Sequence, residues 1–305
     1  MAYLRALGSY VPVRVVDNAE MSARTGADPT WIFEATGMLE RRYAAPEETV
    51  ASMGAVAARE CLASAGGATV GLVLVASGTG ERRFPGPASE IAALLGLGET
   101  PAIDLPIASA GSLFALALAS DLCARYGNVL VVASEMMSRA IGSQRETAIL
   151  FGDGAGACLV SAETGFASIT DSVLSSDGTF AGALRLEHGA TLQMDGRTII
   201  LQAGRKMSRA ITAVLERNQV KPDDVGIYIL HQANLNLITR VARVLGQPEH
   251  KFFVNLDRYG NTSSASLLIA AAEWRHGAPE ITSPVVFASF GAGLHWGAVL
   301  VSPKR

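Results

Sequence analysis

Short apolar runs alternate with longer stretches of helical character along the whole chain. Four runs rich in Val, Ile, Leu and Ala are typical of buried strands: 70–76, 129–134, 226–230 and 285–289. Glycine or proline follows the longer stretches, which predicts helices over Thr49 to Ala65, Ser109 to Tyr126 and Ala203 to Asn218. Strands that alternate with helices predict crossover connections, and therefore an α/β protein with mostly parallel sheets.

The predicted helix that begins at Ser109 has almost no polar face over its first turns. A helix that is apolar all round is buried. Its first residue therefore lies where free backbone N–H groups and the positive end of the helix dipole meet, which suits a nucleophile and the oxyanion that it generates. Helix capping is the more common role of a serine at such a position, so the position alone assigns no chemistry to Ser109.

Two glycine-rich segments about half a chain apart resemble each other. Phe151-Gly-Asp-Gly-Ala-Gly156 leads into an apolar run, and Phe290-Gly-Ala-Gly293 leads into another. Both patterns indicate a glycine turn that precedes a strand. The repeat predicts two similar halves, residues 1–160 with the candidate nucleophile and residues 161–305. Because no linker-like segment separates them, we expect the halves to share a broad interface.

The composition excludes several classes of protein. Of the 305 residues, 49% are hydrophobic and 17% are charged, which excludes intrinsic disorder. The longest strongly apolar run, 110–119, is shorter than the ~20 residues that cross a bilayer. Residues 1–16 lack the features of a secretory signal. We therefore expect a cytoplasmic protein without a membrane partner.

Charge, cysteine usage and common motifs narrow the chemistry. The net charge is −3 with both signs interspersed, so we expect no nucleic-acid partner. Cys61, Cys123 and Cys158 have the spacing of neither a disulfide framework nor a metal site, and we expect them in the core. The glycines at 152, 154 and 156 do not form a dinucleotide fingerprint, and no triphosphate-binding loop is present. Ser109 lacks the earlier glycine of a hydrolase nucleophile elbow.

Two polar residues stand at positions that favour chemistry. His231 follows the predicted strand 226–230, and ligand sites in α/β proteins gather at the carboxyl ends of strands. Asn261 lies in a turn of small residues ahead of an apolar helix. Each residue has an ordinary structural explanation when it is taken alone, as a core histidine or as a turn residue.

Together, five motifs follow the order and spacing of one family: Ala108-Ser-Ala-Gly111, Phe151-Gly-Asp-Gly-Ala-Gly156, His231-Gln-Ala-Asn234, Gly260-Asn-Thr-Ser263 and Phe290-Gly-Ala-Gly-Leu-His-Trp-Gly297. The chain resembles the β-ketoacyl-acyl-carrier-protein synthase III family over nearly its whole length. The resemblance implies the thiolase fold, in which two similar α/β halves form a five-layer αβαβα arrangement, usually in a homodimer.

The resemblance also implies a Cys-His-Asn site. His231 and Asn261 occupy their positions, but Ser109 stands where the family has cysteine. A thiol with a pKa of ~8.5 forms a thiolate readily at a helix N-terminus, whereas a serine hydroxyl needs a neighbouring base. His231 is the only credible base in this pattern. Three explanations of Ser109 remain open: a natural nucleophile, an engineered replacement of cysteine, or a non-catalytic partner subunit of an active ketosynthase.

These residues imply that an acyl group passes from a thioester to Ser109 and then condenses with a malonyl-type thioester, in fatty acid or polyketide biosynthesis. The His231 and Asn261 pair suits this reaction, because two neutral donors stabilise the enolate that remains when carbon dioxide departs. An acyltransferase that forms an ester or an amide is the alternative from the same site. The family's second oxyanion donor, a backbone N–H, maps to Ala292.

The resemblance implies no cofactor, and the substrates are acyl-CoA or an acyl carrier protein that bears the acyl group. Ala35 replaces a family arginine near the CoA phosphates and Asn236 replaces a docking arginine, so both interactions are expected to be weaker. Leu294 replaces a phenylalanine and predicts extra room for the acyl chain. The substrate-contacting residues fall into three groups: Trp31, Arg145, Gly204 and Asn234 for CoA; Phe84, from the partner subunit, with Phe151 and Leu294 for the acyl chain; and Arg209, Arg240 and Arg243 for carrier docking.

Overall fold

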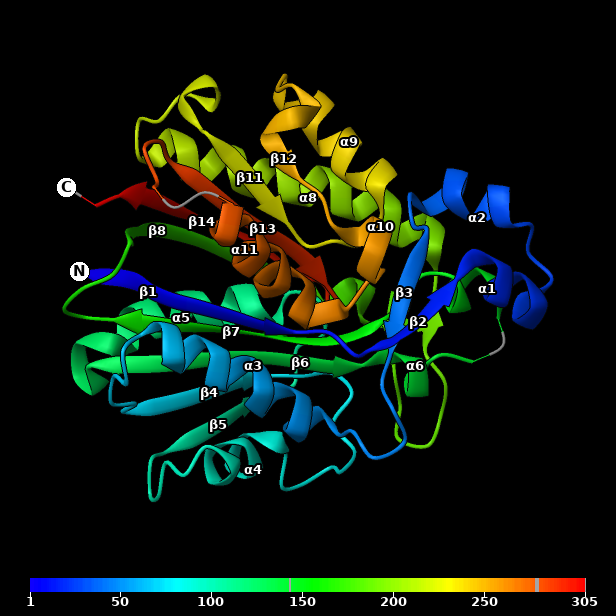
Figure 1. The fold of residues 1–305 in the computed structure, drawn as a ribbon. Helices are drawn as coiled ribbons and strands as arrows, with labels where there is room; N and C mark the ends of the chain where they lie inside the picture. Colours follow the sequence, from blue (N-terminus) through cyan, green and yellow to red (C-terminus); the bar gives the residue numbers. More distant parts are fainter. Residues whose placement is uncertain (143, 278–279, 305) are drawn as a thin grey trace.

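The computed structural model describes residues 1–142, 144–277 and 280–304, and one long twisted sheet forms its centre (Figure 1). The strand order is β12-β11-β13-β14-β8-β1-β7-β6-β4-β5. The strands from the first half of the chain are β1 (Ala2–Tyr10), β4 (Leu72–Ala76), β5 (Ala102–Leu105), β6 (Asn128–Met136) and β7 (Asp153–Ser161). Those from the second half are β8 (Ala167–Ser176), β11 (Ile227–Leu230), β12 (Phe252–Phe253), β13 (Val285–Gly291) and β14 (His295–Pro303).

The two halves of the sheet repeat one pattern of directions. In the first, β1, β7 and β6 pair antiparallel in turn, and β6, β4 and β5 run parallel. In the second, β8, β14, β13, β11 and β12 repeat these directions in the same order. An antiparallel pairing of β1 with β8 joins the halves. The predicted α/β fold with two similar halves is confirmed, whereas the boundary at 160/161 stays a prediction.

The prediction of mostly parallel sheets is wrong, because each half is mixed. β13 and β14 are connected by a short turn at 292–294, and a tight turn of this length joins antiparallel strands. Gly293 in this turn has a φ of 133°, a conformation that residues with a Cβ rarely adopt. The connection between β6 and β7 holds the short helices α6 (Met137–Ala140) and α7 (Arg145–Ala148) and also returns antiparallel.

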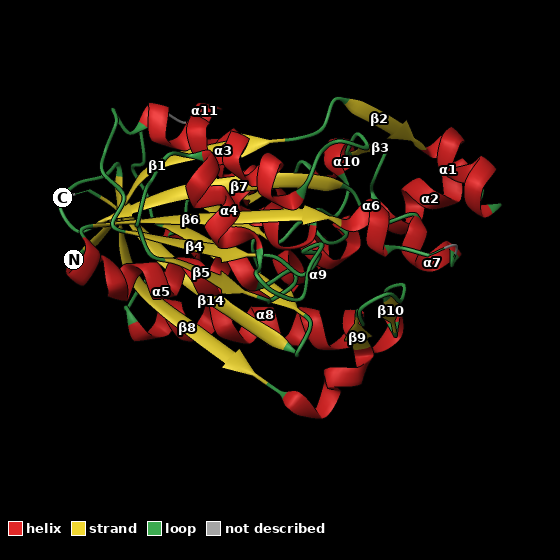
Figure 2. Cartoon of the chain, turned by 90° about the horizontal axis from the view of Figure 1, so that it is seen from below, coloured by secondary structure: helices red, strands yellow, loops and turns green. Residues whose placement is uncertain are grey.

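Helices form three layers, one between the halves of the sheet and one on each outer face (Figures 1 and 2). The central pair, α5 (Gly111–Tyr126) and α11 (Ser266–Gly277), contacts strands of both halves. The outer helices are α3 (Val50–Ser64) and α4 (Pro87–Leu94) on the first half, and α8 (Gly196–Arg217) and α9 (Leu235–Leu245) on the second. The two halves of the sheet and the three helical layers make the five-layer αβαβα arrangement.

The smaller elements gather at the end of the molecule opposite the two chain termini (Figure 2). They form two small hairpin-like sheets and three short helices: β2 (Arg14–Asp17) with β3 (Glu40–Tyr43), β9 (Leu184–Arg185) with β10 (Gln193–Met194), and α1 (Asn18–Thr25), α2 (Pro29–Thr36) and α10 (Leu256–Tyr259). The three cysteines are free and buried, as predicted. Across residues 1–142, 144–277 and 280–304, no helix has the length and apolar character that a membrane span needs.

Local packing shifts some predicted boundaries. Helix α5 begins at Gly111 rather than Ser109, because Ser109 has a left-handed φ of 61°. Helix α8 begins earlier than predicted, at Gly196, where the Asp195 side chain accepts the Thr198 N–H as a cap.

Most of the first glycine motif, from Asp153 to Gly156, lies in β7, so only the second motif contains the predicted glycine turn before a strand. Its glycines allow α11 to approach the sheet. A Cβ on Gly156 would lie only 2.5 Å from the Cβ of Leu268. Small residues at this point of the strand therefore bring the start of α11 close to the centre of the molecule.

Candidate active site

Ser109 lies between β5 and α5 in a left-handed backbone conformation, with a φ of 61°. Such a φ is uncommon outside glycine, and hydrogen bonds hold it here. The Ser109 N–H donates to Ser263 Oγ at 3.0 Å, and Ser289 Oγ donates to the Ser109 carbonyl at 2.9 Å. A Cβ on Gly291 of β13 would lie 2.2 Å from the Ala108 carbonyl oxygen, so only glycine allows this close crossing beside Ser109.

His231 directly follows β11 and is buried. Its Nδ1 lies 2.6 Å from Ser266 Oγ, and the same hydroxyl accepts the Gln232 N–H at 3.1 Å. Burial lowers the pKa of His231 to about 4, so the imidazole is neutral at neutral pH. Ser266 Oγ and Nδ1 share one hydrogen bond, and in the tautomer in which Ser266 donates it, the imidazole carries its proton on Nε2.

Asn261 precedes the 3-10 turn Ser263–Ala265, which leads into α11. Its Oδ1 accepts the Ser263 N–H at 2.9 Å, which leaves the carboxamide NH₂ as its donating end. The backbone of Asn261 also bridges to Phe151. Ser109 and Asn261 therefore both hydrogen-bond to Ser263. His231 hydrogen-bonds to Ser266, in the first turn of α11.

A small cavity of about 40 Å³ lies beside Ser109. Phe151 and Ala292 are part of its wall, together with Ser263 and Leu192. Leu294 is fully buried and packs in the core of the second half, with Phe290 and Ala298, and is not among the lining residues. The extra room expected from Leu294 is therefore not part of this cavity.

Sequence reasoning missed Glu135, at the carboxyl end of β6. Its side chain is fully buried, and its Oε1 accepts Ser263 Oγ at 2.9 Å and Ser264 Oγ at 2.7 Å. Its Oε2 accepts Thr79 Oγ1 at 2.6 Å and the Gly78 N–H at 3.0 Å. Burial raises the pKa of this carboxyl, and these hydrogen bonds oppose the shift. The sequence feature that could have indicated Glu135 is its position as an acidic residue directly after the apolar run 129–134.

The residues expected to contact CoA lie at the rim of the second half. The Arg145 guanidinium lies 4.7 Å from the centre of the Trp31 ring, so these two are neighbours. Asn234 caps α9 through the Asn236 N–H and donates its Nδ2 to the Ala35 carbonyl at 2.8 Å. Both ends of its carboxamide therefore already hold α9 and α2 in place.

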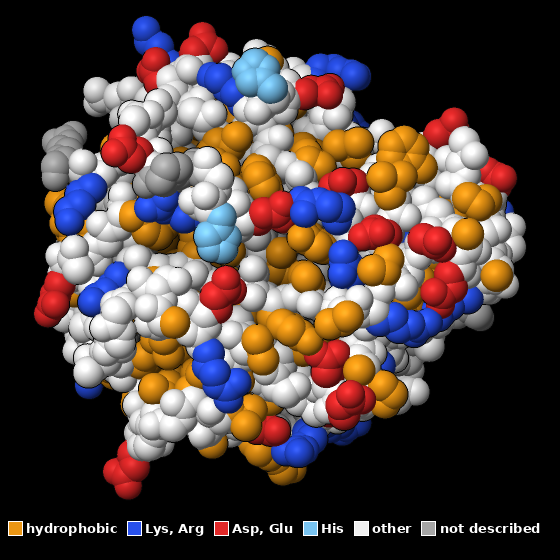
Figure 3. Space-filling model, viewed as in Figure 1, with side chains coloured by type: hydrophobic (Ala, Val, Ile, Leu, Met, Phe, Trp, Pro, Cys, Tyr) orange, Lys and Arg blue, Asp and Glu red, His pale blue; other side chains and the backbone are white. Residues whose placement is uncertain are grey.

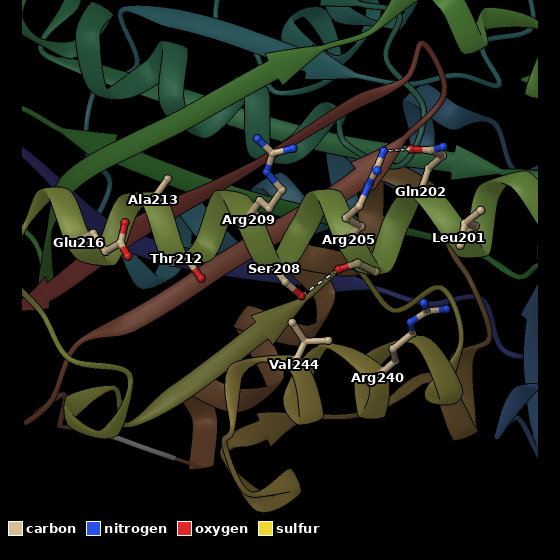
Figure 4. A pocket seen from close by; sticks show the side chains of 11 residues that line it. Leu201, Gln202, Arg205, Ser208, Arg209, Thr212, Ala213, Glu216, Arg240 and Val244 are labelled. Carbon is tan, nitrogen blue, oxygen red and sulfur yellow. Dashed lines mark hydrogen bonds between the residues drawn. The ribbon is translucent and has the colours of Figure 1, made fainter.

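A groove of about 620 Å³ runs between α8 and α9 (Figure 4), and Gly204 is one of its lining residues. Arg205, Arg209 and Arg240 line it, and Arg243 is exposed further along α9. Lys206 follows Arg205 in α8 but is buried and is not part of this basic surface. Its Nζ is buried 2.8 Å from Asp177 and 3.9 Å from the centre of the Trp296 ring.

Phe84 projects from the connection between β4 and α4, and 85% of its surface is exposed. It lines a depression of about 1120 Å³ rather than the cavity beside Ser109 of its own chain. Figure 3 shows acidic and basic side chains interspersed over one face of the molecule, as the sequence indicated.

The repeated half-sheets with α5 and α11 between them define a thiolase-fold protein. Family models for 3-oxoacyl-[acyl-carrier-protein] synthase III match residues 103–178, and those for the C-terminal part of that enzyme match residues 215–302. A β-ketoacyl-[acyl-carrier-protein] synthase III of Oleidesulfovibrio alaskensis is 38% identical, with 98% of each chain covered. The chain belongs to the β-ketoacyl-[acyl-carrier-protein] synthase III family.

Solved structures agree with this assignment. The 3-oxoacyl-[acyl-carrier-protein] synthase III of Aquifex aeolicus superposes with a TM-score of 0.95 at 34% identity, covering 99% of this chain and 100% of that chain. The priming β-ketosynthase of the R1128 polyketide biosynthetic pathway superposes with a TM-score of 0.91 at 32% identity, covering 100% and 97%. The predicted family and thiolase fold are confirmed.

Proposed function

We propose that the protein transfers an acyl group from a CoA or carrier-protein thioester to Ser109 and condenses it with a malonyl-type thioester in fatty acid or polyketide biosynthesis. The observation that supports this most is the position of Ser109. Its hydroxyl belongs to a residue that is 6% exposed, and this residue lines an interior cavity beside the loop that carries Asn261. An ester formed there would be protected from water.

His231 and Asn261 supply the donors for decarboxylation. The neutral imidazole presents its Nε2–H, and Asn261 presents its NH₂, and two neutral donors stabilise the enolate that forms as carbon dioxide leaves. The Ser109 N–H already donates to Ser263 Oγ, so the Ala292 N–H is the backbone donor proposed for the oxyanion.

The size of the cavity favours a short acyl group. One water molecule needs about 10–15 Å³ of such space, and the cavity beside Ser109 measures about 40 Å³. We therefore propose a starter group of a few carbon atoms. A longer chain would have to displace Phe151 or Leu192, both of which are buried.

The surface features fit the other partners. We propose that the neighbouring pair Trp31 and Arg145 opens to hold an adenine ring, since an aromatic ring and a guanidinium both stack on such a plane. The arginine-lined groove between α8 and α9 suits an acidic carrier protein. The exposed Phe84 favours a homodimer that buries it, which sedimentation velocity at micromolar concentration would detect as a species of twice the chain mass.

Intact-mass spectrometry after incubation with short-chain acyl-CoA tests the first step. We expect one acyl group per chain, located on Ser109 by peptide mapping and absent from Ser109→Ala. Addition of malonyl-carrier thioester should then release carbon dioxide and a 3-ketoacyl product. His231→Ala and Asn261→Ala should lose condensation by at least about 100-fold while they retain acylation.

An ester or amide product without carbon dioxide release would favour the acyltransferase. Lack of any acyl group on Ser109, combined with co-purification of a cysteine-bearing relative, would contradict both enzymatic proposals and favour the partner subunit.

A further inference from the structure

A buried carboxylate lies two hydrogen bonds from the candidate nucleophile. Glu135 is fully buried, and its described partners, Ser77, Gly78, Thr79, Ser263 and Ser264, carry no positive charge. A buried carboxylate without a cation is costly to a protein unless hydrogen bonds satisfy it. The hydrogen bonds around Glu135 come from two segments of the chain, 77–79 and 263–264, and Ser263 also contacts Ser109.

Ser263 connects this carboxylate to Ser109. Its hydroxyl donates to Glu135 Oε1 at 2.9 Å and accepts the Ser109 N–H at 3.0 Å. A hydroxyl oxygen accepts two hydrogen bonds, and the Ser109 Oγ lies 3.5 Å away at the second position. Ser263, like Ser109, has a left-handed φ, 49°, a strained conformation that is concentrated at functional sites.

The described hydrogen bonds do not join His231 to Ser109. A serine hydroxyl needs a base, unlike a cysteine thiol at a helix N-terminus. The hydrogen bond described for the imidazole runs between Nδ1 and Ser266 Oγ. Glu135 is the carboxylate that described contacts do connect to Ser109, through Ser263.

We propose that Ser263 relays the hydroxyl proton of Ser109 to the Glu135 carboxylate during acylation. This inference rests on the proposed acylation of Ser109. The Ser109 proton passes to Ser263 Oγ as the Ser263 proton passes to Glu135 Oε1, and the Ser109 oxygen bonds to the thioester carbonyl carbon. The carbon–sulfur bond then breaks, the Ser263 hydroxyl donates its proton to the departing thiolate, and Ser263 Oγ takes the proton from Glu135 Oε1, which restores the carboxylate.

The surroundings of Glu135 accommodate both protonation states. In the carboxylate state, Ser264 Oγ donates to Oε1 at 2.7 Å. When Oε1 holds the proton, it can donate to Ser264 Oγ, which then donates to the Ala76 carbonyl at 3.2 Å. Ser264 can therefore hydrogen-bond to Oε1 in either state, as donor to the carboxylate or as acceptor from the carboxylic acid.

Comparison of nucleophiles tests the relay. Single-turnover acylation of the full-length protein by acetyl-CoA is measured for Glu135→Gln with Ser109 and with Ser109→Cys. We expect Glu135→Gln to slow the serine protein by about 100-fold or more at saturating acetyl-CoA, with an unchanged half-saturating concentration. The same change should slow the Ser109→Cys protein by less than about fivefold, because a thiolate needs no relay. Ser263→Ala should follow the same pattern.

Asp153→Asn is the matched control, since Asp153 is another fully buried carboxylate, on the adjacent strand β7, bonded to Ser138 and Ala44. It should leave the acylation rate within about threefold of the unmodified protein. Equal slowing of the serine and cysteine proteins by Glu135→Gln would overturn the relay in favour of a structural role. An unchanged rate in the serine protein would also overturn it.

A small electrophile tests the proton relay independently of the proposed function. Methanesulfonyl fluoride forms a sulfonyl ester with an activated serine, with loss of hydrogen fluoride, and needs no CoA site. A protein that ignores acetyl-CoA but is sulfonylated at Ser109 in a Glu135-dependent manner would contradict the proposed function and retain the relay. Sulfonylation that is independent of Glu135 would refute the relay.

Discussion

The protonation state of each polar residue around Ser109 follows from what surrounds it. His231 is buried without a carboxylate partner in its described contacts, so burial lowers its pKa and the imidazole is neutral at neutral pH. Burial raises the pKa of Glu135, and the hydrogen bonds that it accepts oppose the shift. In the proposed reaction, His231 is therefore a neutral donor and Glu135 the proton acceptor.

Burial of neutral His231 makes folding sensitive to acid. The pKa falls from 6.5 in an unfolded chain to about 4 in the folded protein, so the unfolded state binds the extra proton between these values. Stability from this residue is complete above pH 6.5 and is lost as the pH falls toward 4. We expect the unfolding free energy of the unmodified protein, relative to His231→Gln, to fall by about 3 kcal/mol over this range.

Urea denaturation of both proteins at several pH values measures the difference in their unfolding free energies. Groups that titrate elsewhere in the chain contribute equally to both proteins, so their contributions cancel. A difference that does not change with pH would contradict the neutral, buried state of His231.

The candidate site forms where strands and helices approach each other closely. Gly291 allows β13 to cross beside Ser109, and Gly156 allows α11 to lie against β7, which positions the Ser263–Ala265 turn. The turn then supplies a hydroxyl to both Ser109 and Glu135. The sequence pattern predicts a turn at the first glycine motif, whereas Gly156 lies in β7 and allows the strand to contact α11.

Gly156→Ala tests the close packing of α11 on β7. The added Cβ would lie 2.5 Å from Leu268 Cβ and 2.9 Å from the Ile269 nitrogen, so the helix must shift. We expect a loss of about 1–3 kcal/mol in unfolding free energy, measured by urea denaturation. Gly178→Ala is the control, because no heavy atom lies within 4 Å of its Cβ position, and it should change stability by less than about 0.5 kcal/mol. Equal effects of the two changes would contradict the packing argument.

At the scale of the whole molecule, each half of the chain supplies part of the candidate site. The first half supplies Ser109 and Glu135, and the second supplies His231, Asn261 and Ser263, so the site exists only where α5 and α11 meet between the sheets. The groove proposed for the carrier protein lies on the second half, between α8 and α9.

Charge reversal in this groove tests the carrier proposal. Arg209→Glu or Arg240→Glu should raise the half-saturating concentration of an acidic acyl-carrier thioester by about fivefold and leave that of a small acyl thioester unchanged. Added salt should shrink the difference. Arg125→Glu, at the far end of α5, is the control and should have no effect on either substrate. An equal change for both thioesters would point to a general disturbance of α8 and α9.

The sequence determined the family and most of the helices and strands, and it indicated Ser109, His231 and Asn261 as candidates, because apolar periodicity, glycine punctuation and motif spacing are local properties of the chain. The tertiary structure decided the rest. Ser109 and Ser263 are 154 positions apart, and Ser263 and Glu135 are 128 apart, so the packing of the two halves brings them into contact. The same packing buries Lys206, moves Leu294 away from the cavity wall and gives Ser109 its left-handed backbone.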